Sequence, residues 1–325
     1  MLPAAVREAL TTLGAMRPRA VLVRGSCVVA TLFLAACGGS GDNASPDETT
    51  PGDGQTLEQL WRAPGDDVAV VPGSSSFEPG RVRVVFLVVD EEGRPVTLPS
   101  ARIWVSRGLE DKPFLETTAD LERIGVPGGA EVDATHIYVA YVPLPKAGKY
   151  WYVAEPEGGR DPVQALGNIV VEKSIAAPGV GEPAPASDTP TLASVGGDAS
   201  KVTTRVPPDL TLVEHSVAET LREHKPFVVT FSTPKFCASR VCGPVVDVVE
   251  EVSKRFEGDD VRFIHVEVYE DNDPAKGYNR WMGEWGLATE PWTFVVGADG
   301  KIASRFEGLV SVHELEAAVH AATKS

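Results

Sequence analysis

In the last third of the chain, apolar residues form continuous short runs in some segments and recur at helical spacing in others. Residues 227–231 form a short apolar run with one polar member, Thr230, which is typical of a strand buried on both faces. From Val245 to Phe256 the apolar residues recur at helical spacing, and charged residues fill the positions between them. The pattern therefore predicts a buried strand that leads through a short turn into an amphipathic helix.

The same alternation continues on both sides of this unit. Ser216 and Glu219 have the spacing of a capping box, which predicts a short helix that ends near Lys225. A second capping box, Ser311 to Glu314, predicts a final helix through Val319. Between them we expect strands at 261–268, 292–296 and 302–306 and a helix at 275–285. The predicted order is helix, strand, helix, strand, helix, strand, strand, helix.

Residues 61–173 have a different pattern, in which short runs of β-forming residues are separated by turn signals. Several short strands at this spacing predict an antiparallel all-β sandwich domain. The aromatic residues in it and the lone His136 are interpreted as structural. The candidate strands are 81–90, 101–107, 135–144, 148–155 and 167–171.

Two polar stretches divide the chain into domains. Residues 37–60 are rich in Gly, Asp, Pro, Ser and Thr, and they cannot bury enough apolar surface to fold, so we expect a flexible tether. Residues 174–207 are rich in Ala, Pro and Gly, and we expect a linker or an extended wrap. An α/β domain then occupies residues 208–325.

The N-terminus has the features of an export signal at residues 1–36. Four arginines precede an apolar stretch from Val28 to Ala36, which is too short to cross a hydrocarbon layer that needs about 20 residues. Leu34-Ala35-Ala36-Cys37 resembles the lipobox of bacterial lipoproteins. That resemblance implies acylation of Cys37, as with palmitate, and a lipid anchor on the extracytoplasmic face of the cell membrane. An ordinary secretory signal is the alternative, and translation could start at Met1 or at Met16.

The net charge of −16 at pH 7 narrows the classes of partner. A surface this acidic argues against binding to nucleic acid or to anionic lipid. Solubility is the simpler purpose of such a charge.

Cys237 and Cys242 lie between the predicted strand and the predicted helix. In a helix, residues five apart have α-carbons about 8.6 Å apart, beyond the roughly 7 Å that a disulfide tolerates, so Cys237 must precede the helix. There the helix amides, Lys235 and Arg240 would favour a thiolate. An inert structural disulfide is the alternative interpretation.

The order of elements, with a cysteine turn after a central strand, resembles the thioredoxin fold over residues 208–325. The segment 180–185 resembles the lead-in of redoxin domains, and 289–296 resembles the segment in which this family places a cis-proline that faces the cysteines. This identifies Pro291 as a site residue. In the preceding domain, 139–153 resembles the closing strands of immunoglobulin-like modules.

The resemblance to thioredoxins implies a membrane-anchored, extracytoplasmic thiol:disulfide oxidoreductase that acts on proteins with thiols or disulfides. Cys237 would attack and Cys242 would resolve, although Cys242-Gly243-Pro244 also resembles the start of the usual attacking motif. Four residues separate the cysteines instead of two, Phe236 replaces a tryptophan, and strand 227–231 lacks the carboxylate of many thioredoxins. The direction, reduction or oxidation, stays open.

Two other functions fit the same cysteines. Some thioredoxin-fold lipoproteins deliver copper through two cysteines and a histidine, and thiolates suit Cu(I). Here His265 and His313 are interpreted as structural, and no metal or cofactor motif is recognised. The other alternative is a redox-inactive binding scaffold that contains a structural disulfide.

Overall fold

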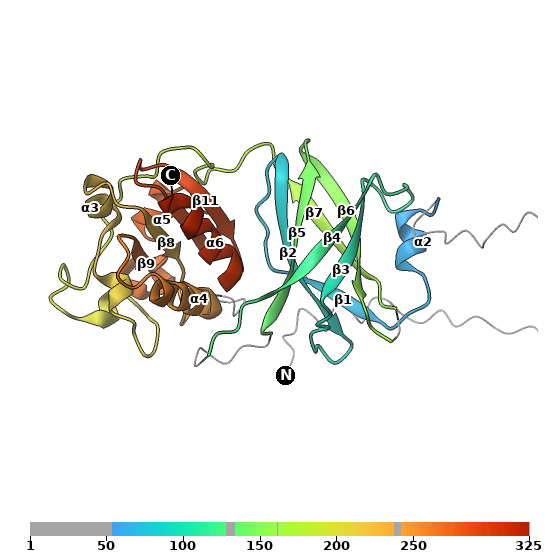
Figure 1. Cartoon of the computed structure of the whole chain (residues 1–325), viewed down its shortest axis with the longest axis horizontal. Coiled ribbons are helices and arrows are strands. Elements are labelled where there is room, and N and C mark those ends of the chain that lie inside the picture. Colours follow the sequence, from blue (N-terminus) through green and yellow to red (C-terminus); the bar gives the residue numbers. More distant parts are fainter. Residues whose placement is uncertain (1–53, 128–133, 161, 237–241, 325) are drawn as a thin grey trace, which may run out of the picture. The chain divides into compact units, whose positions relative to one another are not determined.

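The computed structural model describes residues 54–127, 134–160, 162–236 and 242–324, with only the backbone at Cys242. These residues belong to one compact unit, which contains two β-sheets (Figure 1). The predicted signal peptide, Met16 and Cys37 lie outside the described residues. Within the described ranges, no helix has the length and apolar character needed to span a membrane.

The first sheet has seven strands, and every neighbouring pair is antiparallel. In sheet order they are β1 (Val68–Pro72), β2 (Gly80–Asp90), β5 (His136–Leu144), β4 (Leu115–Arg123), β3 (Ser100–Ser106), β6 (Gly148–Glu157) and β7 (Ala165–Val171). Phe77, just before β2, forms a bridge with Val171 of β7, so the two ends of the sheet approach each other.

This nearly closed sheet corrects the predicted sandwich of two sheets. β4 pairs with both β3 and β5, and it joins strands that a sandwich would divide between two layers. Sequence analysis missed β4 because most of its side chains are polar and only Ala119 is buried. It also missed β1, a strand of five residues on which no side chain is fully buried.

The predicted tether is too long at its C-terminal end. Helix α2 (Leu57–Trp61) begins at a capping box formed by Thr56 and Gln59. Leu57 and Leu60 are buried in a cluster with Trp104 and Val153 of the first sheet. Two apolar residues at helical spacing are therefore enough to attach the end of this polar stretch to the fold.

The second half of the chain has the predicted order of helices and strands. Its elements are α3 (Val217–Arg222), β8 (Phe227–Phe231), α4 (Cys242–Arg255), β9 (Arg262–Val266), α5 (Arg280–Glu284), β10 (Trp292–Val296), β11 (Ile302–Glu307) and α6 (Val312–Thr323). Short 3₁₀ helices are η1 (Ala199–Lys201), η2 (Thr211–Val213), η3 (Glu270–Asn272) and η4 (Pro274–Lys276). α5 is shorter than predicted because Gly277 has a φ of 79° and ends η4.

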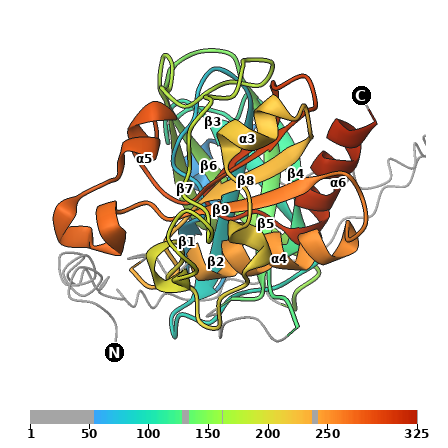
Figure 2. The ribbon, with the colours of Figure 1, turned by 90° about the vertical axis from the view of Figure 1, so that its left-hand side faces the viewer.

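These strands form a four-stranded sheet in the order β11-β10-β8-β9. β8 and β9 are parallel, and the other neighbours are antiparallel. Val228 of β8 packs in a cluster with residues of α4 and α6, whereas Val229 and Phe231 pack with Met282 and Trp285 around α5. Helices thus cover both faces, and α5 and α6 lie on opposite sides of β8 and β9 in Figure 2.

Within the stretch before the second sheet, residues 181–184 lie along the beginning of β11. Gly181 donates to the carbonyl of Ile302 at 2.8 Å, and Ile302 donates back to Glu182 at 2.9 Å. Ala184 then donates to Gly300 at 2.9 Å. These bonds cover the beginning of the outer edge of β11, where an open strand edge could pair with another chain.

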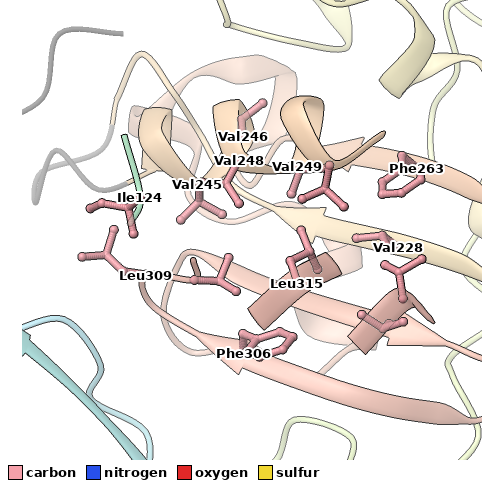
Figure 3. Close-up of a cluster of buried hydrophobic side chains, with 14 of the residues drawn as sticks. Ile124, Val228, Val245, Val246, Val248, Val249, Phe263, Phe306, Leu309 and Leu315 are labelled. Atoms are coloured by element: carbon pink, nitrogen blue, oxygen red, sulfur yellow. The ribbon is translucent and has the colours of Figure 1, made fainter. Parts of the chain in front are cut away.

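Strands β2 and β5 bury apolar side chains on both of their faces. Val84 and Phe86 point into the core of the seven-stranded sheet, while Val85 lies in a second cluster with the helices of the C-terminal half. Figure 3 shows Ile124, just after β4, beside Val245 and Leu309 in this second cluster. The two sheets therefore share a hydrophobic core.

An ion pair lies beside this shared core. Arg83 of β2 binds both carboxylate oxygens of Glu314 in α6, each at 2.7 Å, and it also donates to the Leu309 carbonyl at 2.8 Å. Tyr141 donates to the same carboxylate at 3.2 Å. Burial acts to raise the pKa of Glu314, but the hydrogen bonds and the charge of Arg83 outweigh it, so that the pKa lies below the usual 4.5.

We expect Glu314→Gln to lower the free energy of unfolding by about 3 kcal/mol, since it leaves Arg83 buried without its countercharge. Because the folded pKa is depressed, the contribution of Glu314 is complete above pH 4.5 and is lost as the pH falls through the folded pKa. Urea unfolding at pH 7 and pH 3 measures both effects. Glu316→Gln in the same helix is the control, because its ion pair with Arg255 is exposed and should contribute under about 1 kcal/mol. Equal losses for the two variants would contradict the assignment.

Candidate functional site

The candidate site lies where β8 and β9 end. Because the two strands are parallel, their carboxyl ends meet at the same edge of the sheet. After Phe231 the chain passes through the buried residues Ser232 and Thr233 to a turn at 234–236, and α4 begins at Cys242. The helix thus begins earlier than the apolar pattern from Val245 predicted, and Cys242 is its first residue. Cys237 and Arg240 lie outside the described residues, so the pairing of the cysteines stays a prediction.

Pro291 lies beside this edge. The Glu290–Pro291 peptide bond is cis, as the resemblance to thioredoxins implied. β10 follows immediately and pairs with β8, so that Trp292 is opposite Phe231. This register places the proline next to the residues that lead from β8 into the cysteine turn.

Two acidic side chains, Glu267 and Glu290, lie near each other at this edge of the sheet. The sequence analysis did not identify either side chain as part of the site. Glu267 directly follows β9, is 4% exposed, and accepts a hydrogen bond from the Thr204 amide at 2.5 Å. Its second oxygen is buried without a partner among the described residues. The hydroxyl of Thr233 is in the same situation. A carboxylate oxygen of Glu267 and the hydroxyl of Thr233 are therefore buried near the ends of β9 and β8.

Glu290 is the second carboxylate. Burial raises its pKa to about 7, and the Thr233 amide, which donates to it, opposes this rise. The nearby charge of Glu267 raises the pKa further, and a hydrogen bond from the Tyr269 hydroxyl at 3.4 Å lowers it. At neutral pH Glu290 therefore exists in both protonation states. A glutamate directly before the predicted cis-proline was the sequence signal that could have identified it.

A loop from the extended segment supports the turn and the helix. Arg205 binds Asp247 at 2.9 Å and Glu250 at 2.5 Å, both on α4. Thr204 accepts from the Lys235 amide at 3.2 Å. Lys235 itself is exposed, and its ammonium group lies 5.0 Å from the ring centre of Phe236. The cation expected to favour a thiolate is thus present in the turn.

The two histidines considered as metal ligands lie in different places. His265 is buried in β9, where its Nε2 donates to the Ser232 carbonyl at 2.9 Å and its Nδ1 accepts from Thr203 at 3.3 Å. His313 is at the start of α6, 3.0 Å from Glu122, whose hydrogen bond and charge raise the pKa of this histidine. Hydrogen bonds to protein thus engage both ring nitrogens of His265.

Comparisons with known proteins found limited similarity. No family model matches the sequence. No curated protein matches it either. Among solved structures, neighbours include thioredoxin-family thiol:disulfide interchange proteins. One, from Chlorobium tepidum TLS, is 18% identical with a TM-score of 0.29, over 43% of this chain and 94% of that chain.

Two further structural neighbours were found. StoA from Bacillus subtilis is 17% identical with a TM-score of 0.24, over 29% of this chain and 82% of that chain. The PKD domain of the human receptor SorCS2 is 15% identical with a TM-score of 0.18, over 42% of this chain and 96% of that chain.

The raised pKa of Glu290 predicts a pH-dependent stability. Between pH 4.5 and about 7 the folded protein keeps a proton that the unfolded chain has lost, so stability should decrease as the pH rises through this range. We expect Glu290→Gln to remove this decrease, which should be on the order of 2 kcal/mol. Urea unfolding at pH 5 and pH 8 measures it. Glu110→Gln, at an exposed position, is the control and should behave as the wild type does. A Glu290→Gln variant with the wild-type pH dependence would contradict the assignment.

Proposed function

We propose that this chain is a thiol:disulfide oxidoreductase in which Cys237 and Cys242 form the redox pair. The observation that carries the proposal is the position of the Cys-x4-Cys sequence, which follows a buried strand and ends at the first residue of α4, with Pro291 at the start of the adjacent strand. Thiolates are favoured at helix N-termini and beside cations, and this turn has both a following helix and Lys235.

The proposed exchange proceeds in two displacements. The Cys237 thiolate attacks one sulfur of a substrate disulfide, a mixed disulfide forms, and the other substrate sulfur leaves as a thiolate that takes up a proton. Cys242 then loses its proton and attacks the Cys237 sulfur. The second substrate thiol leaves, and the Cys237–Cys242 disulfide remains. The same steps in reverse oxidise a substrate dithiol, and the reduction potential decides the direction.

We further propose that the chain acts on the extracytoplasmic face of a membrane, anchored through Cys37. Support comes from the lipobox-like sequence at 34–37 and from the basic and apolar residues before it. Two or more acyl chains give stable attachment, whereas one gives only marginal binding. The substrates would be exported proteins with thiols or disulfides, since disulfides persist in oxidising compartments.

Glu290 provides a proton carrier for these steps. Its pKa of about 7 suits a group that both accepts and donates protons at neutral pH. Its carboxyl group accepts a hydrogen bond from the amide of Thr233, a residue that lies four positions before Cys237 in the sequence. We expect the pH profile of disulfide exchange in the wild type to show an inflection near pH 7 and Glu290→Gln to lose it, with a rate reduced by about tenfold at most near pH 7. Stopped-flow reduction of a peptide disulfide between pH 5 and pH 9 measures it, and an unchanged profile would contradict this role.

The reduction potential of the cysteine pair tests the function itself. In full-length protein in detergent, with Cys27→Ser and Cys37→Ser so that only the pair remains, we expect a potential between about −270 and −120 mV, the range of thiol-exchange catalysts. Equilibration with glutathione or dithiothreitol buffers, read by alkylation, measures it. Cys237→Ser and Cys242→Ser should each abolish the two-electron transition. A potential far below about −300 mV would instead indicate a structural disulfide.

A further inference from the structure

A loop of the seven-stranded sheet is connected to the cis-proline segment through the residues at the end of β11. This loop, Gly73 to Ser76, connects β1 to β2 and is held to β2 by its own hydrogen bonds. Gly73 donates to the Val85 carbonyl at 2.8 Å, and the hydroxyl of Ser74 accepts from the Val85 amide at 3.1 Å. Gly73 and Ser74 are both buried, so the 73–76 loop is an ordered part of the first sheet.

The backbone after β11 lies between this loop and Pro291. Gly308 donates to the Pro291 carbonyl at 2.9 Å, and the next amide, Leu309, donates to the Gly73 carbonyl at 3.0 Å. Gly308 has a φ of 77°, and a Cβ there would lie 1.9 Å from the Gly73 oxygen. This position therefore needs glycine for both its conformation and its close approach. Two consecutive amides link the first sheet to the proline.

The side chain of Glu307 makes a second link. Its carboxylate accepts from the Ser75 amide at 2.5 Å, from the Ser75 hydroxyl at 2.8 Å and from the Ser76 amide at 3.1 Å. It also accepts, at 3.4 Å, from Thr289, whose hydroxyl accepts from the Trp292 indole at 3.1 Å. Thr289 and Trp292 flank Glu290 and Pro291 on either side. Thr289, and Trp292 through it, are thus linked to the first sheet by the Glu307 carboxylate.

We propose that Glu307 is a positioning residue through which the 73–76 loop holds segment 289–292 in the geometry that a polypeptide disulfide needs for exchange. The inference rests on the proposed function. A substrate that docks on this segment depends on its position, because small displacements of a binding group can slow a reaction strongly. A small disulfide needs only an accessible thiolate and does not depend on the segment. In this proposal the first sheet helps to hold segment 289–292 in place.

The test compares these two substrates in full-length protein in detergent. We expect Glu307→Gln and Thr289→Val each to lower kcat/KM for a peptide disulfide by about tenfold, while the rate with a small aromatic disulfide changes by less than about twofold. Because both act through one chain of hydrogen bonds, the double variant should be no slower than the slower single variant. Glu110→Gln, which makes the same charge change at an exposed position in the loop between β3 and β4, should match the wild type.

Two outcomes would overturn the proposal. One is a wild-type rate with the peptide disulfide in both variants. The other is an equal loss with both disulfides together with a lowered melting temperature, which would indicate a merely structural role. If the wild type exchanges neither substrate, the proposed function is wrong. The resonance of the Trp292 indole N–H then tests whether Glu307 positions segment 289–292. A shift of that resonance in Glu307→Gln but not in Glu110→Gln supports the link through Thr289, and an unchanged resonance refutes it.

Discussion

The fold depends on a constraint in two strands, β2 and β5, which are apolar on both faces. The first sheet can bury only one of these faces in its own interior, where Phe86 and Tyr138 lie. The opposite face, with Val85 and Val139, must be covered by another element. α4, α6 and the residues after β11 provide that cover. Because burying such a side chain contributes about 1.5–3 kcal/mol, the two sheets are stabilised as one body.

Apolar packing alone does not fix how two surfaces are oriented, because it has no direction. Hydrogen bonds to charged groups have direction, and several such groups lie at this contact. Arg83 binds Glu314 with two parallel hydrogen bonds, and Glu307 accepts three from the 73–76 loop. Both glutamates belong to the C-terminal half, one on β11 and one on α6. We interpret them as the residues that set the register between the two sheets, and hence the position of segment 289–292.

The sequence predicted local features of this protein better than nonlocal ones. The order of elements in 208–325 was predictable because each has a clear period and two helices begin with an N-cap serine, of which Ser311 forms a full capping box and Ser216 only the first of its two bonds. The closed first sheet was not, because pairing of β4 with both neighbours is decided by strands far apart in sequence. The same limit applies to the site. Glu267 and Glu290 are brought together by strand order, and no local pattern connects them. The roles of Cys237 and Cys242 stay predictions, since the former lies outside the described residues.

The absence of a carboxylate within β8 is explained by what surrounds that strand. All five residues of β8 are buried, and four of them are Phe or Val, so a charge there would be far from water. At the strand ends, by contrast, a carboxylate can be partly buried and still accept hydrogen bonds from Thr233 and Tyr269. Full burial without donors would keep such a group protonated, and full hydration would keep it ionised. Only the intermediate position of Glu290 gives a pKa near 7, and with it a group that can change its protonation state at the pH where thiols and disulfides exchange.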